Sequence, residues 1–88
     1  MGEEDVFRRW AREANQHMQY WRRFSGDSQE GGLRYLATIE NRIEVLKKIR
    51  RIGGEDVLGG ISGLIETLEE DAAKVRARIP SLPAYPDI

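Results

Sequence analysis

The chain of 88 residues contains no cysteine and a single histidine, His17. Disulfide bonds, thiolate metal sites and metal sites that need two imidazole ligands are therefore excluded. No apolar run approaches the roughly 18 residues that span a bilayer, and no segment has the apolar core of a secretory signal peptide. From these absences we expect an intracellular protein, cytoplasmic or nuclear and not secreted, that binds neither a membrane nor a metal.

The sequence also lacks the motifs that mark an enzyme. It has no phosphate-binding loop, and His17 has no nucleophile or orienting carboxylate at a recognisable spacing. An acidic cluster at Glu66, Glu69 and Glu70 is spaced to face solvent on one helix, without the apolar pocket that raises the pKa of a carboxyl group. We therefore predict a protein that is not an enzyme, has no catalytic residues and takes no cofactor.

Charge is nearly balanced over the whole chain but not along it. The 14 Lys and Arg residues stand against 15 Asp and Glu, which gives a formal net charge of −1. Residues 1–52 carry 11 basic and 8 acidic side chains (net +3), whereas residues 53–88 carry 3 and 7 (net −4). The overall balance argues against a highly basic nucleic-acid binder, and the charge is polarised along the chain.

Hydrophobic periodicity predicts three helices, at about 3–24, 30–52 and 55–79. The first has an apolar arc of about 100° on the helical wheel, made of Phe7, Trp10, Ala11, Ala14, Met18 and Trp21. The second has an arc of about 140°, made of Tyr35, Leu36, Ile39, Ile43, Leu46 and Ile49. The third has a seam with alternating spacings of three and four, made of Leu58, Ile61, Ile65, Leu68, Ala72, Val75 and Ile79.

Local signals leave the start of the second helix open and fix the end of the third. The second helix begins either near residue 30, with Asp27 and Glu30 as a capping box, or only after Gly31 and Gly32, which weaken its first turn. The third helix is expected to open at residues 55–56, which are acidic, and Pro80 ends it.

These elements predict an all-α fold, a three-helix antiparallel bundle in one domain over residues 1–79. Residues 80–88 contain three prolines and form an extended tail, which would dock Leu82, Tyr85 and Ile88 on the bundle. A chain of this length buries only ~60% of its extended surface. Because so small a core cannot enclose every large apolar side chain, we expect a homodimer or a protein partner.

The first helix carries the main candidate binding surface, opposite its apolar arc. We call it the Arg/amide face, and it consists of Arg8, Arg9, Arg12, Gln16, Gln19, Arg22 and Arg23. Within residues 6–24, no acidic residue lies in this arc. Arginine and amide side chains bind phosphates and base edges, and they match an acidic protein groove equally well. The ordinary alternative is a solvated helix face.

A second candidate surface consists of large apolar or aromatic side chains that the core does not need. These candidate interface residues are Trp10, Tyr20, Trp21, Val45 and Ile52. Exposed aromatic side chains are frequent hot spots of protein interfaces. The ordinary alternative for the two tryptophans is that they anchor the core.

Taken together, the patterns favour a non-enzymatic helical interaction module that binds a protein partner, itself, or both through amphipathic helices. The alternative is binding of duplex RNA or DNA by phosphate contacts from the Arg/amide face. A third class is a small helical enzyme whose arginines clamp a dicarboxylate, as those of chorismate mutases do. No set of residues at a recognisable spacing supports that third class.

Overall fold

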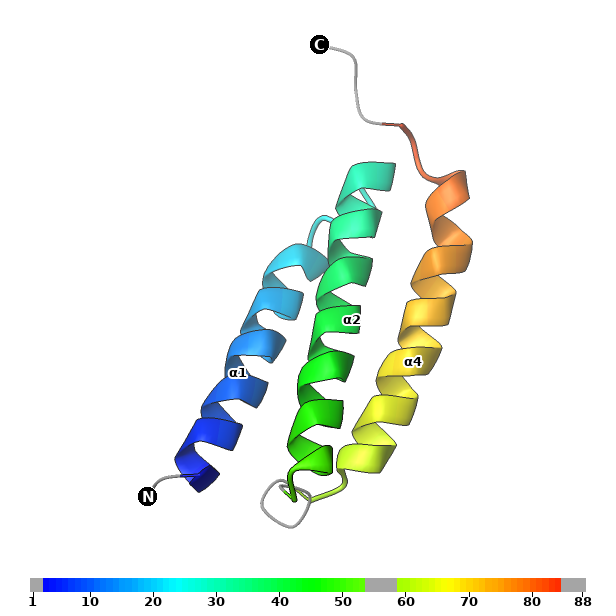
Figure 1. The fold of residues 1–88 in the computed structure, drawn as a ribbon. Coiled ribbons are helices and arrows are strands. Elements are labelled where there is room, and N and C mark those ends of the chain that lie inside the picture. Colours follow the sequence, from blue (N-terminus) through cyan, green and yellow to red (C-terminus); the bar gives the residue numbers. More distant parts are fainter. Residues whose placement is uncertain (1–2, 54–58, 85–88) are drawn as a thin grey trace.

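The computed structural model describes residues 3–53 and 59–84. Within these ranges the chain forms three α-helices and a 3-10 turn and contains no strand (Figure 1). The elements are α1 (Glu3–Arg22), α2 (Gln29–Arg51), α4 (Ile61–Arg78) and η1 (Ile79–Ser81). The prediction of an all-α chain with three helices is confirmed.

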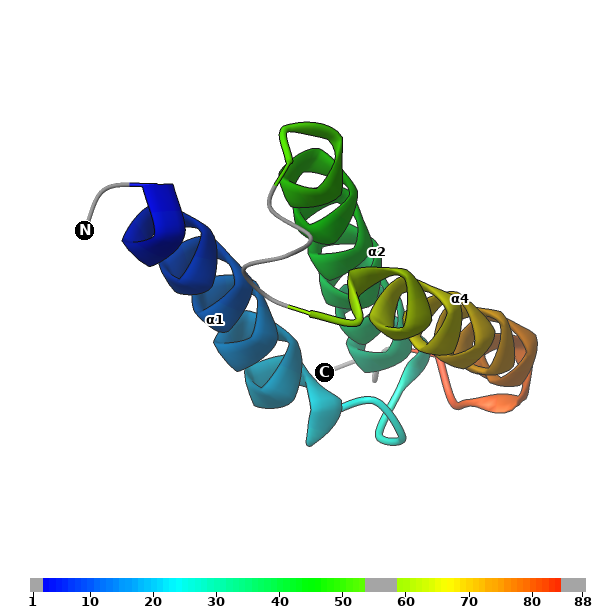
Figure 2. The ribbon, with the colours of Figure 1, turned by 90° about the horizontal axis from the view of Figure 1, so that it is seen from below.

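Helix α2 is the central element of the bundle. α1 and α4 both run antiparallel to α2 and pack along it, whereas they make little direct contact with each other. Figure 2 shows α1 and α4 on different sides of α2. The Cα extents of the chain are 49 × 23 × 15 Å. A closed triangle of helices about 9 Å apart would have Cα extents of only roughly 14 Å in both short directions. The observed extent of 23 Å in one of these directions is larger, so the bundle is open between α1 and α4.

The core lies on the two sides of α2 that face the outer helices. The side chains of Ile39, Leu46, Ile49 and Ile61 are almost completely buried. Phe7, Ala14 and Met18 are the buried apolar residues of α1. The predicted seam of α4 is confirmed from Ile61 to Val75, because all five of its positions there are buried. Leu58, the first predicted seam position, lies outside the described residues.

The helix ends differ from the predicted ones where tight turns replace helical bonds. α1 ends at Arg22, because the N–H groups of Phe24 and Ser25 donate to carbonyls three residues back, at 3.0 and 3.1 Å. α4 begins at Ile61, so the predicted helix start at residue 55 is wrong for residues 59 and 60. Both of these are glycines with a φ of 64°, a left-handed value that glycine adopts without strain. Residues 54–58 lie outside the described ranges.

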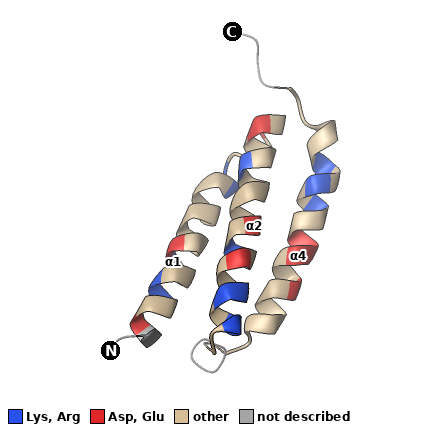
Figure 3. Ribbon diagram, in the orientation of Figure 1, with Lys and Arg blue, Asp and Glu red and all other residues tan. Residues whose placement is uncertain are grey.

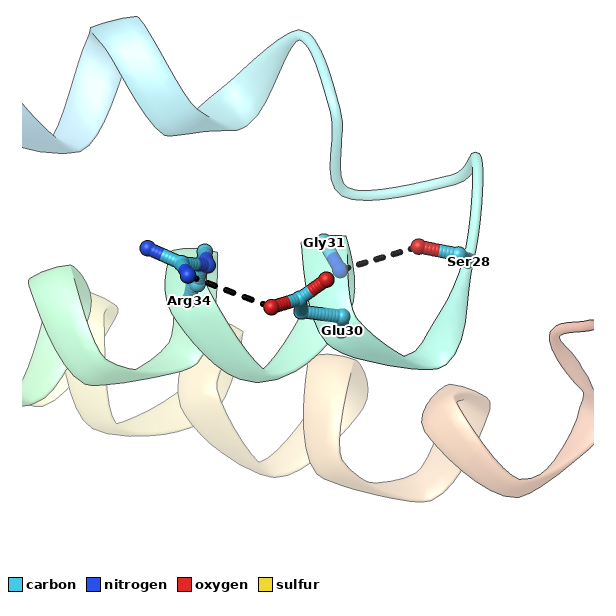
Figure 4. Close-up of polar contacts among 4 residues, drawn as sticks. All are labelled: Ser28, Glu30, Gly31 and Arg34. Atoms are coloured by element: carbon cyan, nitrogen blue, oxygen red, sulfur yellow. Dashed lines mark hydrogen bonds and ion pairs between the residues drawn. The ribbon is translucent and has the colours of Figure 1, made fainter. Parts of the chain in front are cut away.

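The N-terminus of α2 is capped by Ser28 rather than by the predicted Asp27. Ser28 has extended backbone angles, and its Oγ accepts a hydrogen bond from the Gly31 N–H at 3.1 Å (Figure 4). The Glu30 carboxylate, expected to complete a capping box, instead accepts from Arg34 at 3.1 Å. Gly31 lies inside the helix and not in a loop, so the first of the two predicted starts holds.

Two glycines in the first turn of α2 allow other segments to cross it closely. A Cβ on Gly31 would collide with the backbone carbonyl of Phe24, and a Cβ on Gly32 would lie 2.9 Å from Cγ1 of Ile79 and 3.1 Å from Cδ1 of Leu82. The Gln29 N–H also donates to the Pro83 carbonyl at 2.8 Å. The turn after α1 and the segment after α4 are therefore both packed on the start of α2.

The sequence predicts an extended segment over residues 80–88. In the structure, the first residues of this segment are not extended. Pro80 lies in η1, and extended backbone angles begin at Leu82, with φ −82° and ψ 154°. Leu82 is partly buried beside Gly32. Tyr85 and Ile88, which were predicted to dock on the same side, lie outside the described residues.

The packing at Gly31 predicts opposite effects for two Gly→Ala substitutions. Gly31→Ala should lower the free energy of unfolding by about 1–3 kcal/mol, because the Cβ would displace the backbone of the turn after α1. Gly63→Ala should raise it by about 0.5 kcal/mol, because this exposed position of α4 has open space for a Cβ. Urea unfolding followed by circular dichroism measures both. A neutral Gly31→Ala substitution would show that the close crossing is absent.

Candidate functional site

The Arg/amide face is exposed along its whole length. All seven of its residues are solvent-exposed, and none of them forms an ion pair with another described residue. Arg23 lies in the turn that follows α1 rather than in the helix, and its guanidinium carbon is 5.6 Å from the centre of the Tyr20 ring. The face therefore presents arginine and amide groups that are available to a ligand.

One edge of this face borders a groove between α1 and α4. We call it the α1/α4 groove; it has a volume of about 420 Å³ and lies over α2. Gln19 and Arg22 of α1 line its first side. On α4 the lining includes a stripe at spacings of three and four: Leu64, Thr67, Asp71, Lys74 and Arg78. Apolar groups of Met18, Tyr35, Leu68 and Val75 contribute to the lining.

Arg42 of α2 lines the same groove. Its Nε is buried and has no hydrogen-bond partner among the described residues, and its guanidinium forms no ion pair with any of them. Burial lowers the pKa of the Arg42 guanidinium from its ordinary value. A buried N–H without an acceptor costs about 1–3 kcal/mol of stability. Arg42 is therefore a partly desolvated cation that the described part of the protein leaves unsatisfied.

Arg42 was not among the predicted site residues, although the sequence contained a signal for it. On a wheel of ~100° per residue, Arg42 falls inside the apolar arc of α2, between the positions of Tyr35 and Ile49. A charged residue inside an apolar arc points toward the core and needs a partner. Only the structure shows that this position opens into a groove.

The groove is electropositive. Arg22, Arg42, Lys74 and Arg78 line it together with one carboxylate, that of Asp71. Four cations against one anion give a net charge of +3 for the lining residues. Because apolar walls reduce the screening of these charges, the groove favours an anionic group over water.

The five predicted interface residues do not form one surface. Trp10 and Val45 are partly buried and line a second hollow of about 390 Å³ between α1 and α2, together with His17. The Nζ of Lys48 lies 5.0 Å from the centre of the Trp10 ring. Ile52 lies apart from them, after the last residue of α2, and is 52% exposed.

Tyr20 and Trp21 form an aromatic cluster with Phe24 where α1 ends. The ring centres of Tyr20 and Trp21 are 5.2 Å apart, and that of Phe24 lies 5.6 Å from Trp21. The guanidinium of Arg34 covers the Trp21 ring at 4.9 Å, while Tyr20 is 51% exposed. The tryptophans are therefore partly covered by cations, and Tyr20 is the most accessible ring of this cluster.

No protein-family model matches the sequence, and no curated protein or solved structure is significantly similar to it. In residues 3–53 and 59–84, no group of three or more His, Cys, Asp or Glu side chains is placed to hold a metal ion. Over the same described part of the chain, none of the helices combines the length and the apolarity needed to cross a membrane. The Arg/amide face and the α1/α4 groove are thus the features from which a function is inferred.

The unsatisfied state of Arg42 predicts that its removal stabilises the isolated protein. Arg42→Met keeps an apolar stem and removes the desolvated cation, so the free energy of unfolding should rise by about 1 kcal/mol. Arg12→Met on the exposed face is the matched control and should change it by less than about 0.5 kcal/mol. Urea unfolding measures both variants. A loss of stability in Arg42→Met alone would mean that the guanidinium is satisfied within the fold.

Proposed function

We propose that this protein is a non-enzymatic helical interaction module that binds a partner protein through α1 and the α1/α4 groove. The observation that carries the proposal is the open side of the bundle. There, apolar groups and Arg42, whose Nε has no partner among the described residues, line a groove between two helices that scarcely touch each other. Helices with an accessible apolar face commonly bind other helices.

Self-association is one form of this proposal. Figure 3 shows acidic residues in the first half of α4 and basic residues in its second half. Glu66 and Glu70 are exposed, and in a second copy they would complement the Arg/amide face. The exposed side chains of Tyr20 and Ile52 would supply apolar area to such a homodimer.

Binding of duplex RNA or DNA is the second candidate function. It is favoured by the five exposed arginines of the Arg/amide face, none of which is paired within the described residues. Side chains on one helix face can contact successive phosphates of a duplex. The net charge of −1 opposes this function, because a nucleic-acid binder usually carries an excess of positive charge.

Light scattering with and without a short duplex RNA separates the two candidates. For an interaction module we expect the molar mass to correspond to a monomer or a dimer of the 10.1 kDa chain and to remain the same when duplex is added. A mass that increases by that of the duplex at low salt would reject the protein-partner proposal in favour of nucleic-acid binding. The same result with a duplex DNA would show that the 2′-hydroxyl groups are not recognised.

Charge reversal predicts how each candidate responds to substitution. If a duplex binds, Arg12→Glu and Arg23→Glu should each weaken binding. Each should also make the slope of log K against log salt shallower by about 1, which corresponds to the loss of one phosphate contact. If a protein binds, Tyr20→Ala should weaken self-association or partner binding more than either arginine change does at high salt. Arg51→Glu, at an exposed site on α2, controls for the overall change in charge.

A further inference from the structure

We infer that the α1/α4 groove is the docking site of an acidic amphipathic helix from a partner protein, one of whose carboxylates pairs with Arg42. This inference rests on the proposed function and names the chemistry of the partner. Its first support is the shape of the bundle. A fourth helix lying over α2, between α1 and α4, would close the open side into a four-helix arrangement.

The groove presents the apolar contacts that such a helix requires. Leu64 is 40% exposed on the α4 side. Met18 of α1 and Val75 of α4 are core residues that also contribute surface to the groove. The exposed apolar surface of the groove therefore lies mainly on α4, at Leu64, with a small contribution from Met18 of α1. Apolar side chains at spacings of three and four on a partner helix would fill the groove along its length.

The charges of the groove select an acidic helix over a neutral or basic one. Carboxylates beside the apolar stripe of the partner would lie near Arg22 on one side and Lys74 and Arg78 on the other. Like charges on a basic helix would be repelled by the same residues.

Arg42 gives the inference its specific contact. A partner carboxylate would supply the acceptor that the buried Nε lacks, and a charge-assisted hydrogen bond in a partly desolvated site is among the stronger polar contacts. To contact this atom, a phosphate of a nucleic-acid duplex would have to enter the groove between α1 and α4.

The test uses the full 88-residue chain and two fluorescein-labelled synthetic peptides of about 18 residues, or five helical turns. Both peptides carry leucines at spacings of three and four; one has glutamate beside the leucines and the other has glutamine. Fluorescence anisotropy at constant salt measures the Kd of each. We expect the glutamate peptide to bind with a Kd about tenfold lower than that of the glutamine peptide.

Two variants decide whether this advantage arises at Arg42. Arg42→Gln should remove most of the difference between the peptides, whereas Arg51→Gln, an equal loss of charge at an exposed site of α2 outside the groove and the Arg/amide face, should preserve it. Leu64→Glu is a second groove variant that leaves Arg42 in place, and it should weaken the glutamate peptide more than the glutamine peptide. Circular dichroism of each variant shows that the helices are retained.

Several results would overturn the inference. They are a glutamate peptide that does not bind, equal Kd values for the two peptides, equal losses in Arg42→Gln and Arg51→Gln, and displacement of the peptide by a duplex RNA that binds more tightly. If the glutamate peptide fails while light scattering shows a dimer that ignores duplex, the groove inference falls and the interaction module stands. If the duplex binds, the proposed function falls as well.

Discussion

The burial of α2 between α1 and α4 is the constraint on which the rest of this structure depends. Since α2 contributes the almost fully buried side chains of Ile39, Leu46 and Ile49, each outer helix obtains most of its apolar contacts from α2 and few from the other outer helix. Burial of apolar surface stabilises the fold by about 25 cal/mol per Å². The outer helices obtain this stabilisation against α2, without closing the bundle. The open side is a direct result of where apolar burial is concentrated.

The crossing at the first turn of α2 fixes the two outer helices at one end of the molecule. Phe24 passes against Gly31, while Ile79 and Leu82 pass against Gly32. The turn between α1 and α2 and the segment after α4 therefore both pack on the first turn of α2. Neither glycine has room for a larger side chain. The α1/α4 groove extends from this anchored end, with Ser25 and Arg78 among its lining residues.

Ion pairs between the helices are few and contribute little to stability in the described residues. Lys47 pairs with Glu69 at 3.7 Å, and Arg76 pairs with Glu40 at 3.1 Å, so the two ion pairs join α2 to α4. Their side chains are about half exposed, and such pairs contribute roughly 0.2–1 kcal/mol each. The arginines of α1 have no described partner of this kind, which is why the proposed ligand surfaces lie on the α1 side of the molecule.

The sequence by itself determined the three helices, the buried seam of α4 and the one-sided charge of α1, because a helical period of 3.6 residues is a local property. It did not determine that Gly31 lies in a helix, that α4 begins only at Ile61, or that Arg42 meets a groove. Those features depend on how segments distant in the chain approach one another. Helix formation is read from neighbouring residues, whereas the separation of α1 and α4 across α2 is decided only by tertiary packing.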